Sequence, residues 1–297
     1  MPYIASPSVR ARAAREGVDL DALARATGRE TLGHEDVTAA LQGKAGSGAA
    51  EADDPMRFWK IDHAAHGPVR EEKLSRPALL AAQNLAAANS LIPQVTHHDE
   101  ADMRAITAFR DKCRSDATAR GIKLTPLAFQ VMALARCLRD FPRFNASLSP
   151  DGQTLIVKTR IHVGIAVDTQ AGLVVPVIRN ADRKGLWQIA REITDLARRA
   201  RDRKIRPGEI GGASMTISNL GGIGGTAFTP IVNPPEIAIL GITRTEIKPQ
   251  WDGETFRPVP KCPLDLSYDH RAINGADAAK FLAKITQYIK DPREMMT

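Results

Sequence analysis

The segment Ser267–Gly275 holds the side chain best suited to proton transfer in this sequence. It reads Ser-Tyr-Asp-His-Arg-Ala-Ile-Asn-Gly and joins a predicted strand to a predicted helix. An imidazole has an ordinary pKa of about 6.5, so His270 can accept or donate a proton at neutral pH. A single histidine among charged residues is more often structural. The segment by itself therefore leaves both roles open.

A second segment, Thr216–Gly225, places hydroxyl groups at a strand end before four glycines. Glycines allow a ligand to approach the backbone closely, so Ser218 could act as a nucleophile or as a hydrogen-bond donor. The segment lacks the Gly-Lys-Ser/Thr ending of a phosphate loop, the dinucleotide fingerprint and the Gly-x-Ser-x-Gly elbow of hydrolases. The missing elbow argues against the nucleophile. A plain glycine-rich turn is the alternative.

Two histidine pairs are candidate metal ligands: His63 with His66, and His97 with His98. No carboxylate or thiol stands at a convincing ligand spacing from either pair. The sequence therefore predicts no metal site.

The composition of the chain indicates the class of protein to which these residues belong. The 297 residues are 43% hydrophobic and 25% charged, with a net charge of +7. No apolar run approaches the roughly 18 residues of a membrane span, no secretory signal opens the chain, and three scattered cysteines suit a reducing compartment. The basic cluster Arg198–Lys204 ends a predicted helix without interleaved aromatic residues, which disfavours nucleic acid. These features predict a soluble intracellular protein.

A change in amino-acid composition divides the chain into two parts. Residues 43–56 are small and acidic without apolar periodicity, which predicts a flexible linker. Residues 4–42 before it predict a small helical module, with one helix from Ser6-Pro7 to Glu16 and another over Glu35–Leu41. So small a module is better suited to docking a partner than to catalysis.

Residues 57–297 predict an α+β domain with a mixed β-sheet, because runs of helices and runs of strands replace strict alternation. The predicted helices are Arg76–Leu91, Ala101–Arg120, Thr125–Asp140, Leu186–Lys204 and Ala276–Ile289. The predicted strands are Ile92–His98, Thr154–Lys158, Ile161–Asp168, Leu173–Arg179, Ala213–Ser218, Glu236–Thr243 and Leu264–Tyr268.

Several segments in order resemble one family. They are Ile92–Asp99, Pro142–Leu148, Val167–Thr169, Gly172–Val177 and the Ser218 and His270 segments. Residues 57–297 thus resemble the catalytic domain of the 2-oxo acid dehydrogenase acyltransferases, and within them most closely the dihydrolipoyl acetyltransferases of pyruvate dehydrogenase complexes. Residues 4–42 resemble the family's peripheral subunit-binding domain, carried by Ser6–Arg10, Gly17–Leu20 and Glu35–Val37.

The resemblance implies a chloramphenicol acetyltransferase-like fold and a direct acyl transfer between dihydrolipoamide and coenzyme A, which is a substrate here. It makes His270 the general base for the coenzyme A thiol and Ser218 the hydrogen-bond donor to the oxyanion. It also implies a homotrimer whose sites lie between subunits, His270 from one and Ser218 from its neighbour.

Two positions depart from the family pattern. Many relatives carry an aspartate four residues after the catalytic histidine, where this sequence has Asn274. The amide can orient the imidazole but cannot stabilise an imidazolium as a carboxylate does. Arg10 matches a basic partner-binding position, but the Gly-Arg pair of the second loop is missing, and the stretch Gly28–Gly33 is one residue short.

The family context sets the remaining expectations. The lipoyl group is expected from a lipoyl domain outside this chain, because no Asp-Lys-Ala turn between strands occurs here. Two explanations are open: the chain is a piece of a longer protein, or the lipoyl domain belongs to another chain. Residues 4–42 are expected to bind a dehydrogenase component of the complex. Trimers are expected to assemble into a cage through a carboxyl-terminal knob at Met295 and Met296. No nucleic acid or membrane partner is expected, and the location is cytoplasmic, or the mitochondrial matrix in a eukaryote.

Three alternatives remain at this point. One is a non-catalytic structural subunit of the same complex, which His270 disfavours because such subunits lack the catalytic histidine. Another is an acyltransferase for a succinyl or branched-chain group. The third is a chloramphenicol acetyltransferase-like enzyme, against which the small amino-terminal module and the segments Ile92–Asp99 and Val167–Val177 speak.

Overall fold

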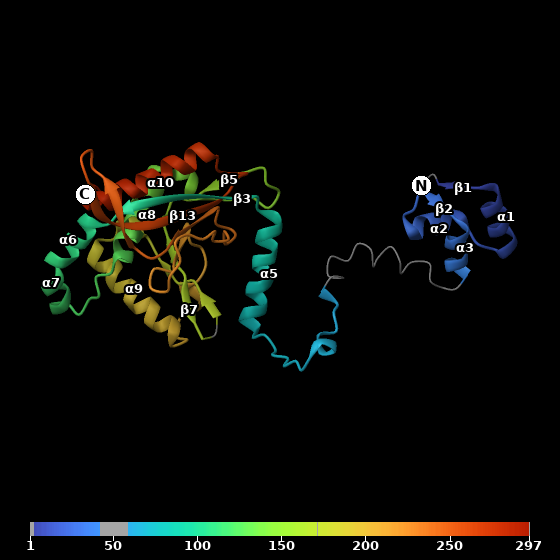
Figure 1. Cartoon of the computed structure of the whole chain (residues 1–297), viewed down its shortest axis with the longest axis horizontal. Coiled ribbons are helices and arrows are strands. Elements are labelled where there is room, and N and C mark those ends of the chain that lie inside the picture. The colour runs from blue at the N-terminus through green and yellow to red at the C-terminus, as the bar shows by residue number, and fades with distance from the viewer. Residues whose placement is uncertain (1–2, 42–58, 171, 297) are drawn as a thin grey trace. The chain divides into compact units, whose positions relative to one another are not determined.

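Two units make up the chain in the computed structural model, residues 1–73 and residues 74–297 (Figure 1). The structure describes residues 3–41, 59–170 and 172–296. The linker predicted over residues 43–56 lies outside the described residues.

The amino-terminal unit contains the helices α1 (Pro7–Glu16), α2 (Leu20–Thr27) and α3 (His34–Leu41), and β1 (Ile4–Ala5) pairs in parallel with β2 (Thr31–Leu32). Ser6 caps α1 by accepting a hydrogen bond from the amide of Val9, and Gly17 ends it in the left-handed conformation. The two helices predicted in this unit are confirmed. Helix α2 lies between them and buries Leu20 and Leu23.

The second unit is organised around a seven-stranded sheet with the order β12-β13-β11-β10-β6-β9, in which β3 also pairs with β13. Strand β10 runs parallel to β6 and β11, whereas the other pairs are antiparallel. The predicted mixed sheet is therefore confirmed. The strands are β3 (Gln94–Asp102), β6 (Val163–Ile165), β9 (Val177–Ile178), β10 (Met215–Asn219), β11 (Ala238–Ile242), β12 (Glu246–Trp251) and β13 (Phe256–Asp269).

Strand β13 pairs with three other strands of this sheet. Its first half pairs with β12, and its second half lies between β11 and β3, with Tyr268 opposite Ala238 and Asp269 opposite Gln94. The residues after Asp269 therefore emerge at the end of the sheet where β3 begins.

Helices cover one face of the sheet, and Figure 1 shows them stacked against it. Side chains of α6, α8, α9 and α10 share one core with those of β10, β11 and β13. Within this core the Phe144 ring stacks on Phe281 at a centroid distance of 4.0 Å, and Phe129 meets Phe109 edge to face at 5.6 Å. The helices are α5 (Arg76–Leu91), α6 (Arg104–Lys112), α7 (Arg114–Ala119), α8 (Pro126–Asp140), α9 (Leu186–Arg201) and α10 (Gly275–Lys290).

The opposite face of the sheet carries buried polar side chains, among them Thr216, Asp265, Ser267 and Asp269. The carboxyl-terminal end of α5 packs there, with Ala88 against Ile92, Val232 and Ile239. The rest of α5 leaves Leu79, Leu80 and Leu85 exposed to solvent, and Leu91 at the end of the helix is exposed as well. This helix has an apolar surface that its own unit does not bury.

Three predicted elements differ from the structure. The helix predicted over Ala101–Arg120 is wrong, because β3 continues to Asp102 and Cys113 separates α6 from α7. The strands predicted over Ile161–Asp168 and Leu173–Arg179 are each divided. Their inner parts form a separate hairpin of β7 (Val167–Thr169) and β8 (Gly172–Val174), and Pro176, which has no amide hydrogen to donate, precedes β9.

Strands β12 and β4 (Ala146–Leu148) were not predicted, and β4 pairs with β5 (Leu155–Val157). Both missed strands are short or lie at an edge, where few positions are buried and the apolar pattern is weak.

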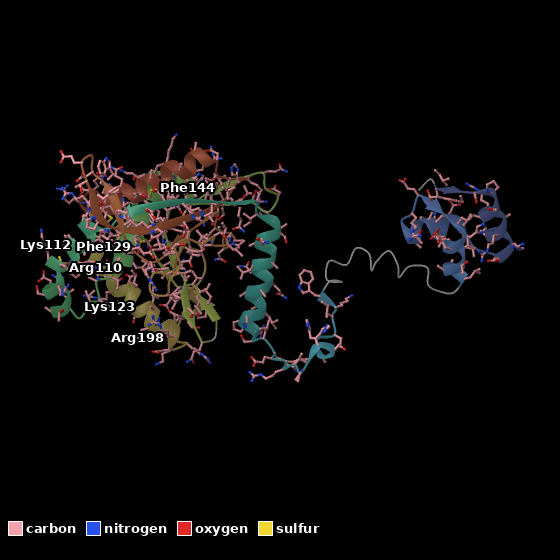
Figure 2. All side chains as sticks on the ribbon, viewed as in Figure 1. Arg110, Lys112, Lys123, Phe129, Phe144 and Arg198 are labelled. Carbon is pink, nitrogen blue, oxygen red and sulfur yellow. The ribbon has the colours of Figure 1, made fainter. Side chains whose placement is uncertain are left out.

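The basic cluster at the end of α9 is partly neutralised. Arg199 contacts both Asp195 and Glu209, and its hydrogen bond to Glu209 lowers the pKa of that carboxyl to about 2. Figure 2 shows Arg198 at the periphery, together with Lys112 and Lys123, whereas Phe129 and Phe144 lie within the packed body. None of the helices in the described ranges is long and apolar enough to cross a membrane.

Close packing between β6 and β10 predicts a sensitive position at Gly164. A methyl group there would lie 2.5 Å from Thr216 Oγ1 and 3.0 Å from the Val175 side chain. Replacement by Ala should lower the free energy of unfolding by about 1–3 kcal/mol through overpacking. Gly208→Ala, where no atom lies within 4 Å, is the matched control for urea unfolding. Equal stability of the two variants would contradict this packing.

Candidate active site

His270 follows directly after β13, and backbone hydrogen bonds fix it on both sides. The amide of Asp269 donates to the carbonyl oxygen of Ile237 at 2.8 Å, and the amide of His270 donates to that of Pro93 at 3.1 Å. The His270 side chain itself is exposed. A rigid backbone thus presents an imidazole to solvent, as proton transfer to a bound substrate requires.

The turn after His270 is held by the buried carboxylate of Asp269. It accepts hydrogen bonds from the amide of Arg271 at 3.0 Å and from its guanidinium at 2.7 Å. Only 2% of Asp269 is exposed, and its hydrogen bonds and charge raise the pKa of Arg271. A charge-assisted bidentate pair of this kind restricts the turn that carries His270.

The rings of Tyr268 and His97 pack beside the same turn. Tyr268 is fully buried, and its ring lies 5.8 Å from that of His270 and 5.7 Å from that of His97. The Tyr268 hydroxyl is 3.2 Å from His97 Nδ1. Burial raises the pKa of Tyr268, so this hydroxyl stays protonated and the ring beside His270 uncharged.

Asn274 stands at the amino terminus of α10. Its Oδ1 accepts a hydrogen bond from the amide of Asp277 at 2.8 Å and caps the helix. The amide oxygen is therefore occupied, and the NH₂ group is the part of this side chain left to act toward a neighbour.

Ser218 lies in β10, opposite Gly241 of β11. It is half-buried, and in the described part of the chain no group forms a hydrogen bond with its hydroxyl. The glycines after it form a loop without helix, in which the amide of Gly221 donates to Asn219 Oδ1 at 2.8 Å. The hydroxyl is thus available to a ligand.

One chain does not bring Ser218 and His270 together. Ser218 aligns through Gly241 with Asp265 of β13, and His270 lies five residues beyond Asp265. Two strand spacings and five strand residues separate the two positions by roughly 15–20 Å. Two groups that far apart cannot act on the same acyl carbon.

The four histidines considered as metal ligands have different surroundings. His97 lies in the aromatic stack, His98 projects to the opposite face of β3, and His63 and His66 belong to a short 3₁₀ helix of the first unit. In the described ranges, no cluster of three or more His, Cys, Asp or Glu side chains could hold a metal ion.

Sequence reasoning missed one buried charged residue near Ser218. Asp265 is 1% exposed and contacts His98 Nδ1 at 2.6 Å. The available signal was an aspartate inside the apolar run Pro263-Leu264-Asp265-Leu266. A buried carboxylate in such a run requires a partner, although the sequence does not say which one.

The comparisons with known proteins agree with one another. Residues 66–297 match the family model of the 2-oxoacid dehydrogenases acyltransferase catalytic domain. The chain is 41% identical to the dihydrolipoyllysine-residue acetyltransferase of the pyruvate dehydrogenase complex from Cupriavidus necator and 43% identical to that from Azotobacter vinelandii, each over 98% of its length. It spans about half of those relatives, 55% and 47% respectively.

Solved structures give the same result. The chain is similar to the Azotobacter vinelandii dihydrolipoamide acetyltransferase, with a TM-score of 0.78 and 45% identity over 80% of this chain and 98% of that one. It is also similar to the cubic core of a pyruvate dehydrogenase multienzyme complex, with a TM-score of 0.78 and 46% identity over the same shares.

The Asp269 pair predicts a stability effect at the His270 turn. Asp269→Asn should lower the free energy of unfolding by about 1–2 kcal/mol, because it weakens the charge-assisted hydrogen bonds that the buried carboxylate accepts from Arg271. Asp291→Asn removes a pair of the same spacing to Arg293, which is 89% exposed, and should cost less than about 0.5 kcal/mol. Chemical unfolding measures both variants. Equal losses would show that the burial of Asp269 does not matter.

Proposed function

The chain belongs to the 2-oxoacid dehydrogenase acyltransferase family, and on that premise we propose that it transfers an acetyl group between dihydrolipoamide and coenzyme A in a pyruvate dehydrogenase-type complex. One observation carries the proposal. The Azotobacter acetyltransferase has a serine, a histidine and an asparagine whose role in catalysis was investigated, and their spacings of 52 and four residues are those of Ser218, His270 and Asn274. The lipoyl group would arrive on a lipoyl domain outside this chain.

His270 would activate the coenzyme A thiol. A thiol with an ordinary pKa of about 8.5 is mostly protonated at neutral pH, and only the thiolate is strongly nucleophilic. The imidazole takes the thiol proton as sulfur attacks the acetyl carbon of S-acetyldihydrolipoamide. The carbon–sulfur bond to dihydrolipoamide then breaks, and the imidazolium returns the proton to the departing sulfur.

Ser218 would stabilise the intermediate between these two steps. Attack on the thioester creates a tetrahedral oxyanion, and a hydroxyl without another partner can donate a hydrogen bond to it. Asn274 would offer its NH₂ group beside His270, since its oxygen caps α10. The acyl group moves directly from one sulfur to the other without bonding to either side chain.

The separation of His270 and Ser218 supports a site shared between copies of this chain. If the two residues act together, His270 must meet the Ser218 of a neighbour, and a closed ring of three such head-to-tail contacts gives a homotrimer. The exposed leucines of α5 support the same arrangement, because an apolar helix surface of this kind is typical of a subunit interface. The cytoplasm, where coenzyme A is available, is the location that we propose.

Residues 4–42 would dock a dehydrogenase component. Arg10 is exposed, its Nε donates to the carbonyl oxygen of Ala5 at 3.1 Å, and its guanidinium lies 5.4 Å from the ring centre of Tyr3. The side chain is thus held outward in one position, which suits contact with an acidic surface. Arg29, in the shortened loop, instead pairs with the buried Asp36 at 2.7 Å.

The structure corrects the expected carboxyl-terminal knob. Met295 is fully buried in the core of its own unit, so it cannot insert into another trimer, whereas Met296 is 38% exposed. Met296 borders a cavity of about 290 Å³, and its lining combines the apolar Ala105, Phe109 and Pro292 with the charged Lys112, Lys290, Asp291 and Arg293. Contact between Met296 and this cavity in another trimer would join trimers into a cage.

His270→Ala should lower turnover in acetyl transfer by about 10²–10⁴, the usual contribution of a general base. Ser218→Ala should lower turnover by about 10²–10³ with little change in the KM for coenzyme A, because its hydrogen bond forms in the transition state. An assay with acetyl-coenzyme A and free dihydrolipoamide measures both. Activity of His270→Ala within threefold of the parent, or a rise in KM alone for Ser218→Ala, would refute the respective role.

Assembly is tested at Met296. Met296→Lys should convert a cage into trimers that keep their activity per subunit, because Lys112, Lys290 and Arg293 in the cavity lining would repel the added cation. Met296→Leu should keep the cage. Light scattering gives the mass of each, and a cage that survives Met296→Lys would show that this residue is not the contact.

A further inference from the structure

Asp265 contacts two segments, β3 and the loop that contains Phe228, which are far apart in the sequence. The carboxylate lies in β13, where Oδ1 contacts His98 Nδ1 of β3 at 2.6 Å and Oδ2 accepts a hydrogen bond from the amide of Phe228 at 3.3 Å. Phe228 belongs to the glycine-rich loop after Ser218. Asp265 is 1% exposed, whereas 49% of the His98 side chain reaches solvent. The buried carboxylate of Asp265 therefore fixes the loop to the sheet, and the His98 imidazole is the second group that contacts this carboxylate.

This loop has few other fixed points. The hydroxyl of Thr243 binds the carbonyl oxygen of Thr226, and Gln94 Oε1 accepts from the amide of Val232. Between Thr226 and Val232, the bond to Asp265 is the one hydrogen bond that the described residues make to the loop backbone. The position of Phe228 thus depends on Asp265.

The Phe228 ring lies beside Ser218. Ser218, Gly241 and Asp265 are aligned across β10, β11 and β13, so they share one face of the sheet. Gly241 has no side chain, and the ring occupies the space, with ring carbons 2.7 and 2.8 Å from where a Cβ would stand. The ring therefore lies one strand spacing, about 4.8 Å, from the Ser218 position.

We propose that Asp265 and His98 are positioning residues that hold the Phe228 ring as the wall of the acyl site next to Ser218. The inference rests on the proposed acyl transfer. An apolar wall at this point limits the size of the acyl group and excludes water from the oxyanion, which strengthens the hydrogen bond from Ser218. Neither Asp265 nor His98 touches the reacting atoms, because the ring stands between them and Ser218.

Two substitutions at Asp265 separate anchoring from general damage. Asp265→Ala removes the acceptor for the Phe228 amide, so turnover with acetyl-coenzyme A should fall about tenfold while the KM for coenzyme A stays within about twofold. Butyryl transfer relative to acetyl transfer should rise about tenfold, because the ring can leave its place. Asp265→Asn keeps an oxygen for the Phe228 amide and an NH₂ group for His98 Nδ1. It should restore most of the acetyl turnover and the parental acyl preference.

Ser267→Ala is the matched control on the same strand. It removes the hydrogen bond of 2.7 Å between Ser267 and Thr96, which joins the same two strands two residues away and does not touch the loop. Its acyl preference should equal that of the parent. Unchanged acyl preference in Asp265→Ala, or an equal change in Ser267→Ala, would overturn the proposal.

Amide hydrogen exchange over residues 226–231 tests the anchor without an activity assay. Exchange there should accelerate in Asp265→Ala but not in Asp265→Asn or Ser267→Ala, because a freed loop opens more often. If the parent chain transfers no acetyl group, the proposed function fails, and exchange still decides whether Asp265 holds the loop. Unaltered exchange in Asp265→Ala overturns the anchor itself.

Discussion

The register of β13 against its neighbours fixes how far His270 lies from Ser218. Because Asp265 is aligned with Ser218 through Gly241, and His270 follows β13 five residues later, the two residues occupy different ends of one rigid sheet. A hydrogen-bonded sheet cannot slip by single residues without turning its core side chains to the other face. The separation is thus a fixed property of the fold, and catalysis by both residues requires a second copy of the chain.

Buried carboxylates bind turns and loops to this sheet. Asp269 holds the turn of His270 through Arg271, Asp265 binds the loop after Ser218, and Glu236 accepts hydrogen bonds from Thr216 and Asn233. Burial raises the pKa of Glu236. Since an unpaired buried carboxylate is costly, each of these contacts specifies one position for the segment that it binds. The carboxylates on the polar face of the sheet therefore fix the position of the glycine-rich loop, which has few hydrogen bonds of its own.

The sequence predicted those features that depend on local chemistry. Helices α5, α8 and α10 were predicted with nearly the bounds that they have in the structure, where Ser75 and Asn274 cap α5 and α10. The roles of the His270 and Ser218 segments were predicted from residue types and family motifs and stay a prediction. Their separation did not, because strand register is set by contacts between distant segments. The partner of Asp265 and the burial of Met295 were missed for the same reason.

The shared site is tested most directly by mixing two inactive variants. Trimers reassembled from equal amounts of His270→Ala and Ser218→Ala chains should regain about one quarter of the parental activity, because about that fraction of interfaces joins an intact His270 to an intact Ser218. Each variant alone should stay inactive after the same treatment. No recovery in mixed trimers of verified composition would contradict a site divided between copies and place both residues in one chain's site.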